Sequence, residues 1–309
     1  MTITAAGLAG GGVVDGGTSI ARSVGSVTSG QCVIFGAVHL NLSGTDDPFV
    51  VGDLTQTAGS ATISDIRLHG QAGGNFGGAG GNYGRAVVYS CLVTGSGTLT
   101  LTLAGQPTGT FLFAASEALN GSWDTAREEA VAAGGLNTAD AISSISSGNV
   151  TTAGAGIIIG MMVLNDGVNQ TITEDGAFTL VAESQNGSTS AMGSMIYRIV
   201  ATGTTDAGDW TFNTTDGNAY CGAAAIAVAL KEAAAAASLE QEGFRFGVDD
   251  GSETTHTWAA AQDANLSAPA GKQILAVNIN ATGATGAKLF KLQYRKVGTT
   301  DWLGVPVSD

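Results

Sequence analysis

Three histidines, His39, His69 and His256, are the side chains best suited to acid–base chemistry at neutral pH. A serine hydrolase needs a histidine beside a serine and a carboxylate, and such a site assembles from positions far apart in the chain. The histidines are widely spaced, share no local motif and form no pair at metal-ligand spacing. Their positions therefore give no support for a hydrolase, although they leave that class open.

Paired carboxylates are the second group that could carry chemistry, because glycosidases use two of them as acid and base or nucleophile. The acidic side chains considered for this role are Glu117, Asp124, Glu128 and Glu129. The alanine-rich segment between Trp123 and Leu136 predicts a short helix packed on the remaining structure. On that helix Asp124 and Glu128 share a face with Arg127 nearby, which indicates a solvated helix face rather than a catalytic pair.

A glycine-rich stretch, Gly70–Gly84, suggests a phosphate-binding loop at first sight. No Lys-Ser/Thr pair follows it, it lacks the Gly-x-Gly-x-x-Gly spacing, and it precedes a strand instead of a helix. We therefore predict a long loop at a sheet edge, which Phe76 and Tyr83 could anchor.

Acidic residues crowd a turn at Asp249-Asp250-Gly251-Ser252-Glu253, where a calcium ion would find oxygen ligands. The alternating Asp-x-Asp-x-Asp-Gly spacing of a calcium loop is absent, so the segment favours an Asp-Gly hairpin turn. The cysteines, Cys32, Cys91 and Cys221, are odd in number and lack zinc spacing, which predicts small buried apolar side chains. Cys32 and Cys91 could face one another. The sequence predicts no catalytic, cofactor-binding or metal-binding residue, and no cofactor.

The elements that would position these residues are short strands. In Thr98–Leu103 leucine alternates with threonine, the pattern of a half-buried antiparallel strand. Three arginines, Arg67, Arg85 and Arg198, interrupt otherwise uncharged strands, so we expect each to pair with an acid or to lie at an interface. Many short strands separated by Gly, Asn and Asp predict an all-β sandwich.

An imperfect repeat divides residues 27–230 into two similar halves. Its four matched pairs of segments are residues 27–36 and 150–160, 87–95 and 195–203, 98–103 and 209–213, and 111–115 and 223–230. The halves could form one pseudo-symmetric sandwich or two tandem sandwiches. We favour one sandwich, since neither half ends in a linker.

Charge and composition set the remaining boundaries. All five lysines lie at or after Lys231, so residues 1–230 carry five arginines against 17 acids, a net charge of −12. An alanine-rich linker over residues 231–238 then separates the pseudo-repeated domain, 27–230, from a domain at 239–309. Residues 1–26 are glycine-rich and predict a flexible arm that is disordered alone or orders against a partner.

The last domain carries the most informative pattern. It begins Leu239-Glu240-Gln241-Glu242-Gly243-Phe244-Arg245-Phe246, continues through Asp249–Glu253 and Ala260-Ala261-Gln262-Asp263, and ends Leu292-Gln293-Tyr294-Arg295 and Asp301-Trp302. This stretch resembles an immunoglobulin-like module found at the ends of tailed-bacteriophage virion proteins, although Phe246 stands where tryptophan is more frequent. Residues 27–230 resemble the jelly-roll-like modules of phage structural proteins.

The resemblance implies a virion protein. We expect a non-enzymatic capsid decoration protein on the particle surface that binds the major capsid protein or other virion proteins and forms a homo-oligomer, with a trimer as our guess. The first alternative is a tail or fibre adhesion module that stacks host glycans on Trp123, Trp210, Trp258 or Trp302; the second is a hydrolase on a sandwich fold.

The bulk charge excludes other classes of partner. The net charge of −14 argues against nucleic acid and against anionic membrane surfaces, both of which call for clustered Lys and Arg. The first residues, Met1 to Gly7, lack the pattern of a secretory signal, and no apolar run approaches the roughly 20 residues of a membrane helix. We therefore expect synthesis in the host cytoplasm.

Overall fold

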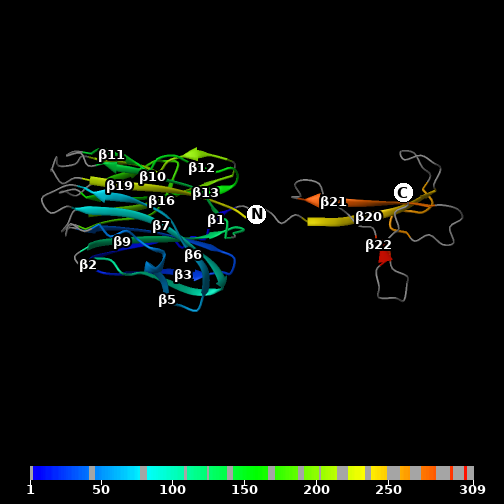
Figure 1. Cartoon of the computed structure of the whole chain (residues 1–309), viewed down its shortest axis with the longest axis horizontal. Coiled ribbons are helices and arrows are strands. Elements are labelled where there is room, and N and C mark those ends of the chain that lie inside the picture. The colour runs from blue at the N-terminus through cyan, green and yellow to red at the C-terminus, as the bar shows by residue number, and fades with distance from the viewer. Residues whose placement is uncertain are drawn as a thin grey trace. The chain divides into compact units, whose positions relative to one another are not determined.

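The protein folds almost entirely into antiparallel strands, which form two compact units, Met1–Ala233 and Ala234–Asp309 (Figure 1). The computed structural model describes residues 3–41, 46–76, 82–107, 110–123, 125–137, 142–165, 171–186, 191–201, 203–213, 222–233, 238–248, 258–264, 273–282, 293–294 and 303–304. Within these residues the one helical element is a short 3-10 turn, η1 (Val51–Asp53). The all-β prediction is confirmed.

The first half of the larger unit contains a large and a small sheet. The large sheet has the order β1 (Thr4–Ala5), β9 (Thr110–Asn120), β4 (Cys32–Asn41), β7 (Tyr83–Gly95) and β6 (Thr62–Asn75), and β2 (Gly10–Gly17) also pairs with β9. The small sheet has the order β3 (Ile20–Val27), β8 (Gly97–Leu103) and β5 (Leu54–Ala58).

The second half repeats this arrangement. Its large sheet has the order β10 (Glu128–Asn137), β19 (Gly222–Lys231), β13 (Gly156–Asn165), β16 (Ala191–Val200) and β15 (Thr179–Asn186). Its small sheet has the order β11 (Ser144–Ser146), β18 (Asp209–Phe212) and β14 (Ile172–Glu174), and β12 (Val150–Thr151) pairs with β17 (Thr205–Asp206). The matched segments of the sequence repeat thus become strand pairs at equivalent places: β4 and β13, β7 and β16, β8 and β18, β9 and β19.

The two large sheets pack face to face, and each small sheet covers the outer face of its own large sheet. One core cluster joins side chains of β4, β7 and β9 to side chains of β13, β16 and β19. Two further clusters fill the space under the small sheets. The chain therefore combines the two arrangements that its repeat allowed, since each half is a sandwich and the halves share one central core.

The central position of β4 and β13 explains their unbroken apolar sequences. Ile34 and Val38 face the central core, while Val33 and Phe35 face the small sheet of the first half. Every residue of both strands is buried. A strand covered on both faces has no solvent side on which a polar residue would be favoured.

Two expectations about flexible or helical segments are wrong. The glycine-rich arm, residues 1–26, contains β1, β2 and most of β3, which pair with β9 and β8. Gly11 also lets β2 lie close to β15 (Thr179–Asn186) of the second half, because a Cβ on Gly11 would come within 2.6 Å of the Ala182 Cβ atom. The helix expected between Trp123 and Leu136 is largely strand β10, because pairing with β19 overrides the helix preference of alanine.

The smaller unit is described in part. Strand β20 (Ser238–Val248) pairs with β21 (Gln273–Thr282), and β22 (Gln293–Tyr294) pairs with β23 (Leu303–Gly304). The rings of Phe244 and Phe246 meet edge to face at 5.7 Å. The predicted turn at Asp249–Glu253 lies outside the described residues, and the immunoglobulin-like fold stays a prediction. The division between the units falls within the predicted linker, residues 231–238.

Candidate functional site

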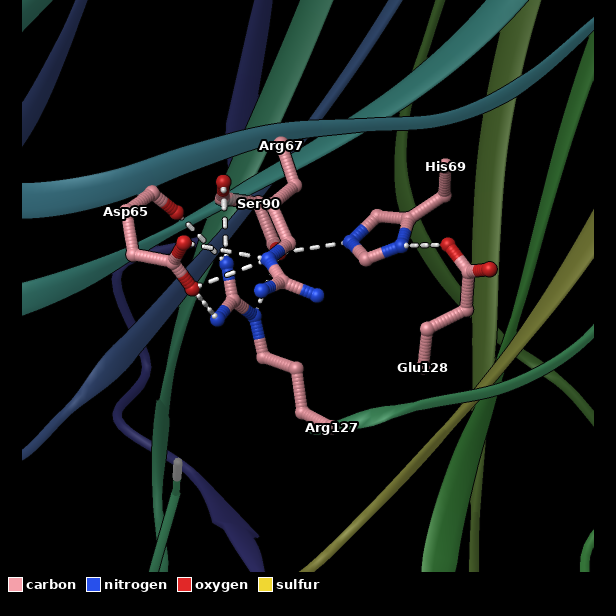
Figure 2. A network of polar contacts seen from close by, with 6 residues as sticks. All are labelled: Asp65, Arg67, His69, Ser90, Arg127 and Glu128. Carbon is pink, nitrogen blue, oxygen red and sulfur yellow. Dashed lines mark hydrogen bonds and ion pairs between the residues drawn. The ribbon is translucent and has the colours of Figure 1, made fainter. Parts of the chain in front are cut away.

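The densest group of polar side chains lies where the two halves of the larger unit meet, and we call it the polar seam (Figure 2). Strand β6 contributes three of its members, β7 contributes one, and the start of the second half contributes two. The members are Asp65, Arg67, His69, Ser90, Arg127 and Glu128. A break in the register of β6 between Ser64 and Arg67 accompanies a left-handed backbone at Asp65, where φ is 49°.

Arg127 joins the second half to the first. Its side chain is fully buried, and its Nη1 lies 2.5 Å from Asp65 Oδ2 while its Nη2 donates to the Asp65 carbonyl at 2.7 Å. Its Nε donates to Ser90 Oγ at 2.7 Å. Burial raises the pKa of the Asp65 carboxyl, but hydrogen bonds from Arg127 and Arg67 outweigh this and hold the pKa below its ordinary value. The pair is therefore ionised, and it ties residue 127 to β6 and β7.

His69 forms the other half of the seam. Its Nε2 lies 2.6 Å from Ser90 Oγ, and its Nδ1 lies 2.5 Å from Glu128 Oε2. Since Ser90 Oγ already accepts from Arg127, the serine hydroxyl can donate to Nε2 while Nδ1–H donates to Glu128. Burial lowers the pKa of His69 and the Arg127 and Arg67 charges add to this, whereas Glu128 opposes it. The imidazole is therefore neutral at pH 7.

Ser90, His69 and Glu128 follow the hydrogen-bond order of a catalytic triad. Ser90 is fully buried, however, and the Arg127 guanidinium lies against its hydroxyl. The neighbouring Cys32 thiol is also buried, which raises its pKa to about 12, so it is not a thiolate at neutral pH. Ser90 and His69 are thus enclosed in this arrangement, where with Glu128 they hold the two halves in contact.

The other candidate residues lie apart from the seam. His39 is buried, its Nδ1 is 2.7 Å from Gln106 Oε1, and its ring lies 4.8 Å from that of Phe49. Glu117 Oε1 accepts hydrogen bonds at 2.9 Å from the amides of Leu8 and Ala118. Asp124 and His256 lie outside the described residues. Of the carboxylates considered for a catalytic pair, Glu117 and Glu128 thus have separate structural partners.

The expected arginine pairs are confirmed. Arg67 pairs with Asp65, Arg85 pairs with Asp46, and Arg198 pairs with Asp206. Sequence reasoning missed the role of Arg127, because the predicted helix placed it on a solvated face. The signal that could have revealed it is the scarcity of charge: only five arginines occur in residues 1–230.

Two of the cysteines are small buried side chains, as the sequence predicts, but they do not face one another. Cys91 lies in the core beneath the small sheet, whereas Cys32 approaches Ser90 on the opposite face of the large sheet. Both are free thiols. Burial raises the pKa of Cys91 to about 12 as well. Cys221 lies outside the described residues.

The glycine-rich stretch and the tryptophans have ordinary structural positions. The loop predicted over Gly70–Gly84 is wrong at both of its ends, because pairing between the two strands makes Gly70–Asn75 part of β6 and Tyr83–Gly84 the start of β7, while residues 77–81 lie outside the described residues. Phe76 is buried between the sheets. Trp210 is fully buried and donates from Nε1 to Ser194 Oγ at 3.1 Å. Trp258 is 39% exposed and stacks under Arg245 at 4.7 Å, while Trp302 lies outside the described residues.

The described residues show neither a metal cluster nor a membrane-spanning helix, and the chain matches no known relative. Among the described residues no group of three or more His, Cys, Asp or Glu side chains is arranged to hold a metal ion. In the same part of the chain, no helix has the length and apolar character needed to cross a membrane. No known protein family, no curated protein and no solved structure matches the chain.

Proposed function

We propose that this protein is a non-enzymatic structural component of a tailed-bacteriophage virion, most simply a decoration protein on the capsid surface. The observation that carries the proposal is the closure of the polar seam. Ser90 and His69, which stand with Glu128 in the order of a catalytic triad, are buried, and the three side chains join two sandwiches. The protein then acts through its outer surfaces. The resemblance of residues 239–302 to virion modules indicates that it belongs to the class of virion structural proteins.

The outer face of the small sheet β3-β8-β5 is one such surface. Thr100 and Thr102 alternate with the buried leucines of β8, and Thr55 and Ser23 pair beside them from the two neighbouring strands. Thr57 and Thr102 join their hydroxyls at 2.7 Å across the sheet. These small uncharged side chains make a pleated surface on which a neighbouring subunit can pack without desolvating charges.

Binding to particles tests the proposal. Purified protein is mixed with capsids from a phage strain that lacks its gene, and the mixture is sedimented. Saturable co-sedimentation with capsids supports a decoration role, and density in cryo-electron micrographs then locates it on the shell. Failure to bind capsids, tails or fibres in this assay would refute the proposal. Sedimentation of the protein alone tests the proposed homo-oligomer, for which a trimer is the expected state.

A tail or fibre adhesion protein that binds host glycans is the second candidate. The exposed Trp258 ring, held by the Arg245 guanidinium, is the observation in its favour, since sugars stack on such rings. A glycan array should then give hits that the Trp258→Ala variant loses. An array without hits removes this candidate and leaves the decoration proposal untouched.

A further inference from the structure

The polar seam places a titratable imidazole across the junction of the two halves. His69 belongs to β6 of the first half, Glu128 begins β10 of the second half, and their side chains lie 2.5 Å apart. The His69 side chain is fully buried, whereas the Glu128 side chain is 42% exposed. The two ring nitrogens therefore contact Ser90 in the first half and Glu128 in the second half.

The hydrogen-bond chain is satisfied with a neutral ring. Arg127 Nε donates to Ser90 Oγ, the Ser90 hydroxyl donates to His69 Nε2, and His69 Nδ1–H donates to Glu128. A proton added at Nε2 would turn this nitrogen into a second donor toward Ser90 Oγ. The displaced hydroxyl hydrogen would then face the Cys32 sulfur, a weak acceptor.

The charges around the ring also oppose a second proton. Arg67 from β6 and Arg127 from the start of the second half add two positive charges, and Asp65 and Glu128 balance them. With a neutral imidazole these four side chains sum to zero charge, and with an imidazolium the seam carries one uncompensated positive charge. Solvent around Glu128 weakens the one attraction that favours the imidazolium.

We propose that His69 is a proton-sensitive link between the two halves, which holds the junction closed when neutral and loosens it when protonated. The direction of this pH dependence follows from the pKa of His69, which burial lowers in the folded protein. A histidine that binds fewer protons when folded contributes stability above its ordinary pKa of about 6.5, and loses it as pH falls toward the folded pKa. Acidification below about pH 6.5 should thus loosen the contacts of the seam locally, while the shared core keeps both sandwiches folded and together.

Hydrogen exchange on the full-length protein tests this link at three amides. The Lys231 amide donates to the Arg127 carbonyl beside the seam, the Ala61 amide to Thr98 in the first half, and the Phe212 amide to Ser143 in the second half. Between pH 7 and pH 5.5, after correction for the intrinsic exchange rate, protection of Lys231 should fall up to about tenfold. Protection of Ala61 and Phe212 should not change.

Two histidine variants make the test specific. His69→Gln removes the titrating group, so protection of the Lys231 amide should become independent of pH across this range. His39→Gln removes the other described buried histidine and should preserve the fall. Equal loss of protection at all three amides, or a fall that survives His69→Gln, would overturn the proposal.

A spectroscopic readout covers the case in which His69→Gln does not fold. In the wild-type protein, nitrogen chemical shifts of the imidazole should report the neutral tautomer with a proton on Nδ1 at pH 7. Its titration midpoint should lie below 6.5, and protection of the Lys231 amide should fall between about pH 6.5 and that midpoint. An imidazolium at pH 7, or a midpoint above 6.5, contradicts the proposed link.

Discussion

Buried charge in this protein occurs where it joins distant segments. Arg127 donates hydrogen bonds to Asp65 and Ser90, which lie 62 and 37 residues away in the chain. Desolvating a guanidinium is costly unless its donors are satisfied, and here a bulge in β6 turns both the carboxylate and the carbonyl of Asp65 toward it. The buried polar groups around Arg127 therefore attach the second half of the unit to the first.

Replacing Arg127 tests this attachment. Arg127→Met keeps the length of the side chain but leaves Ser90 and the Asp65 carbonyl without their donor. We expect a loss of about 3 kcal/mol in the free energy of unfolding, near the lower end for a broken buried pair, because Arg67 still pairs with Asp65. Urea denaturation measures it. Arg198→Met, which breaks a more exposed pair, is the control and should cost about 1 kcal/mol at most; equal losses would contradict the distinction.

Glu117 provides a pH-dependent prediction. Burial raises the pKa of its carboxyl, and the amides of Leu8, Ala118 and Ala9 oppose this. A raised folded pKa means that the ionised form is disfavoured on folding, so wild-type stability from this group declines as pH rises through the folded pKa. Glu117→Gln should therefore be more stable than wild type at pH 7, with the gain vanishing near pH 4. A variant that is less stable at pH 7 would show that the charge itself holds Leu8.

At the scale of elements, strand patterns that depend on burial could be predicted and segments that depend on distant pairing could not. The alternation in Thr98–Leu103 and the repeat of residues 27–230 both appear in the structure as predicted. The glycine-rich β2 and the alanine-rich β10 have little pattern of their own. They become strands because β9 and β19 offer free edges, which a local reading of the sequence cannot detect.

The seam was unpredictable for the same reason. Asp65, Ser90 and Arg127 lie far apart in the sequence and meet only after both sheets have formed. The helix expected near Arg127 also placed its side chain in solvent. By contrast, the prediction that each isolated arginine pairs with an acid needed only the scarcity of charge, and it held for Arg67, Arg85 and Arg198.

Close packing of the large sheets can be tested at a single glycine. A Cβ atom on Gly193 of β16 would lie 2.5 Å from the Phe113 ring of β9, in the facing sheet. Gly193→Ala should force the sheets apart and cost about 1–3 kcal/mol, which thermal or urea unfolding would measure. Gly12→Ala, where a Cβ meets nothing within 4 Å, is the matched control and should change stability by less than about 1 kcal/mol. Equal losses of stability in the two variants would show that the facing sheets can accommodate an added methyl group at Gly193.

At the scale of the whole molecule, the central core makes each half depend on the other. The large sheets bury their apolar faces against one another, so a half alone would expose residues such as Ile34, Phe113, Ile159 and Ile226 to water. The two halves of the first unit should thus unfold together in one cooperative transition.

Fragments of the chain test this dependence. Residues 1–233 should fold alone, with a Tm within a few degrees of the full-length value. Residues 1–122 should be insoluble or unfolded when expressed alone, and should regain native circular dichroism when co-expressed with residues 123–233. A soluble, cooperatively folded fragment of residues 1–122 would contradict a shared core.

We propose that this chain acts through its surfaces as a part of a virion. If so, the protein must be physically present in phage particles. Quantitative mass spectrometry of gradient-purified virions, from the phage that encodes it, measures this together with the major capsid protein as a reference. We predict a fixed ratio to the capsid protein that survives repeated banding. Absence from particles, with all of the protein left in the soluble lysate, would contradict the account.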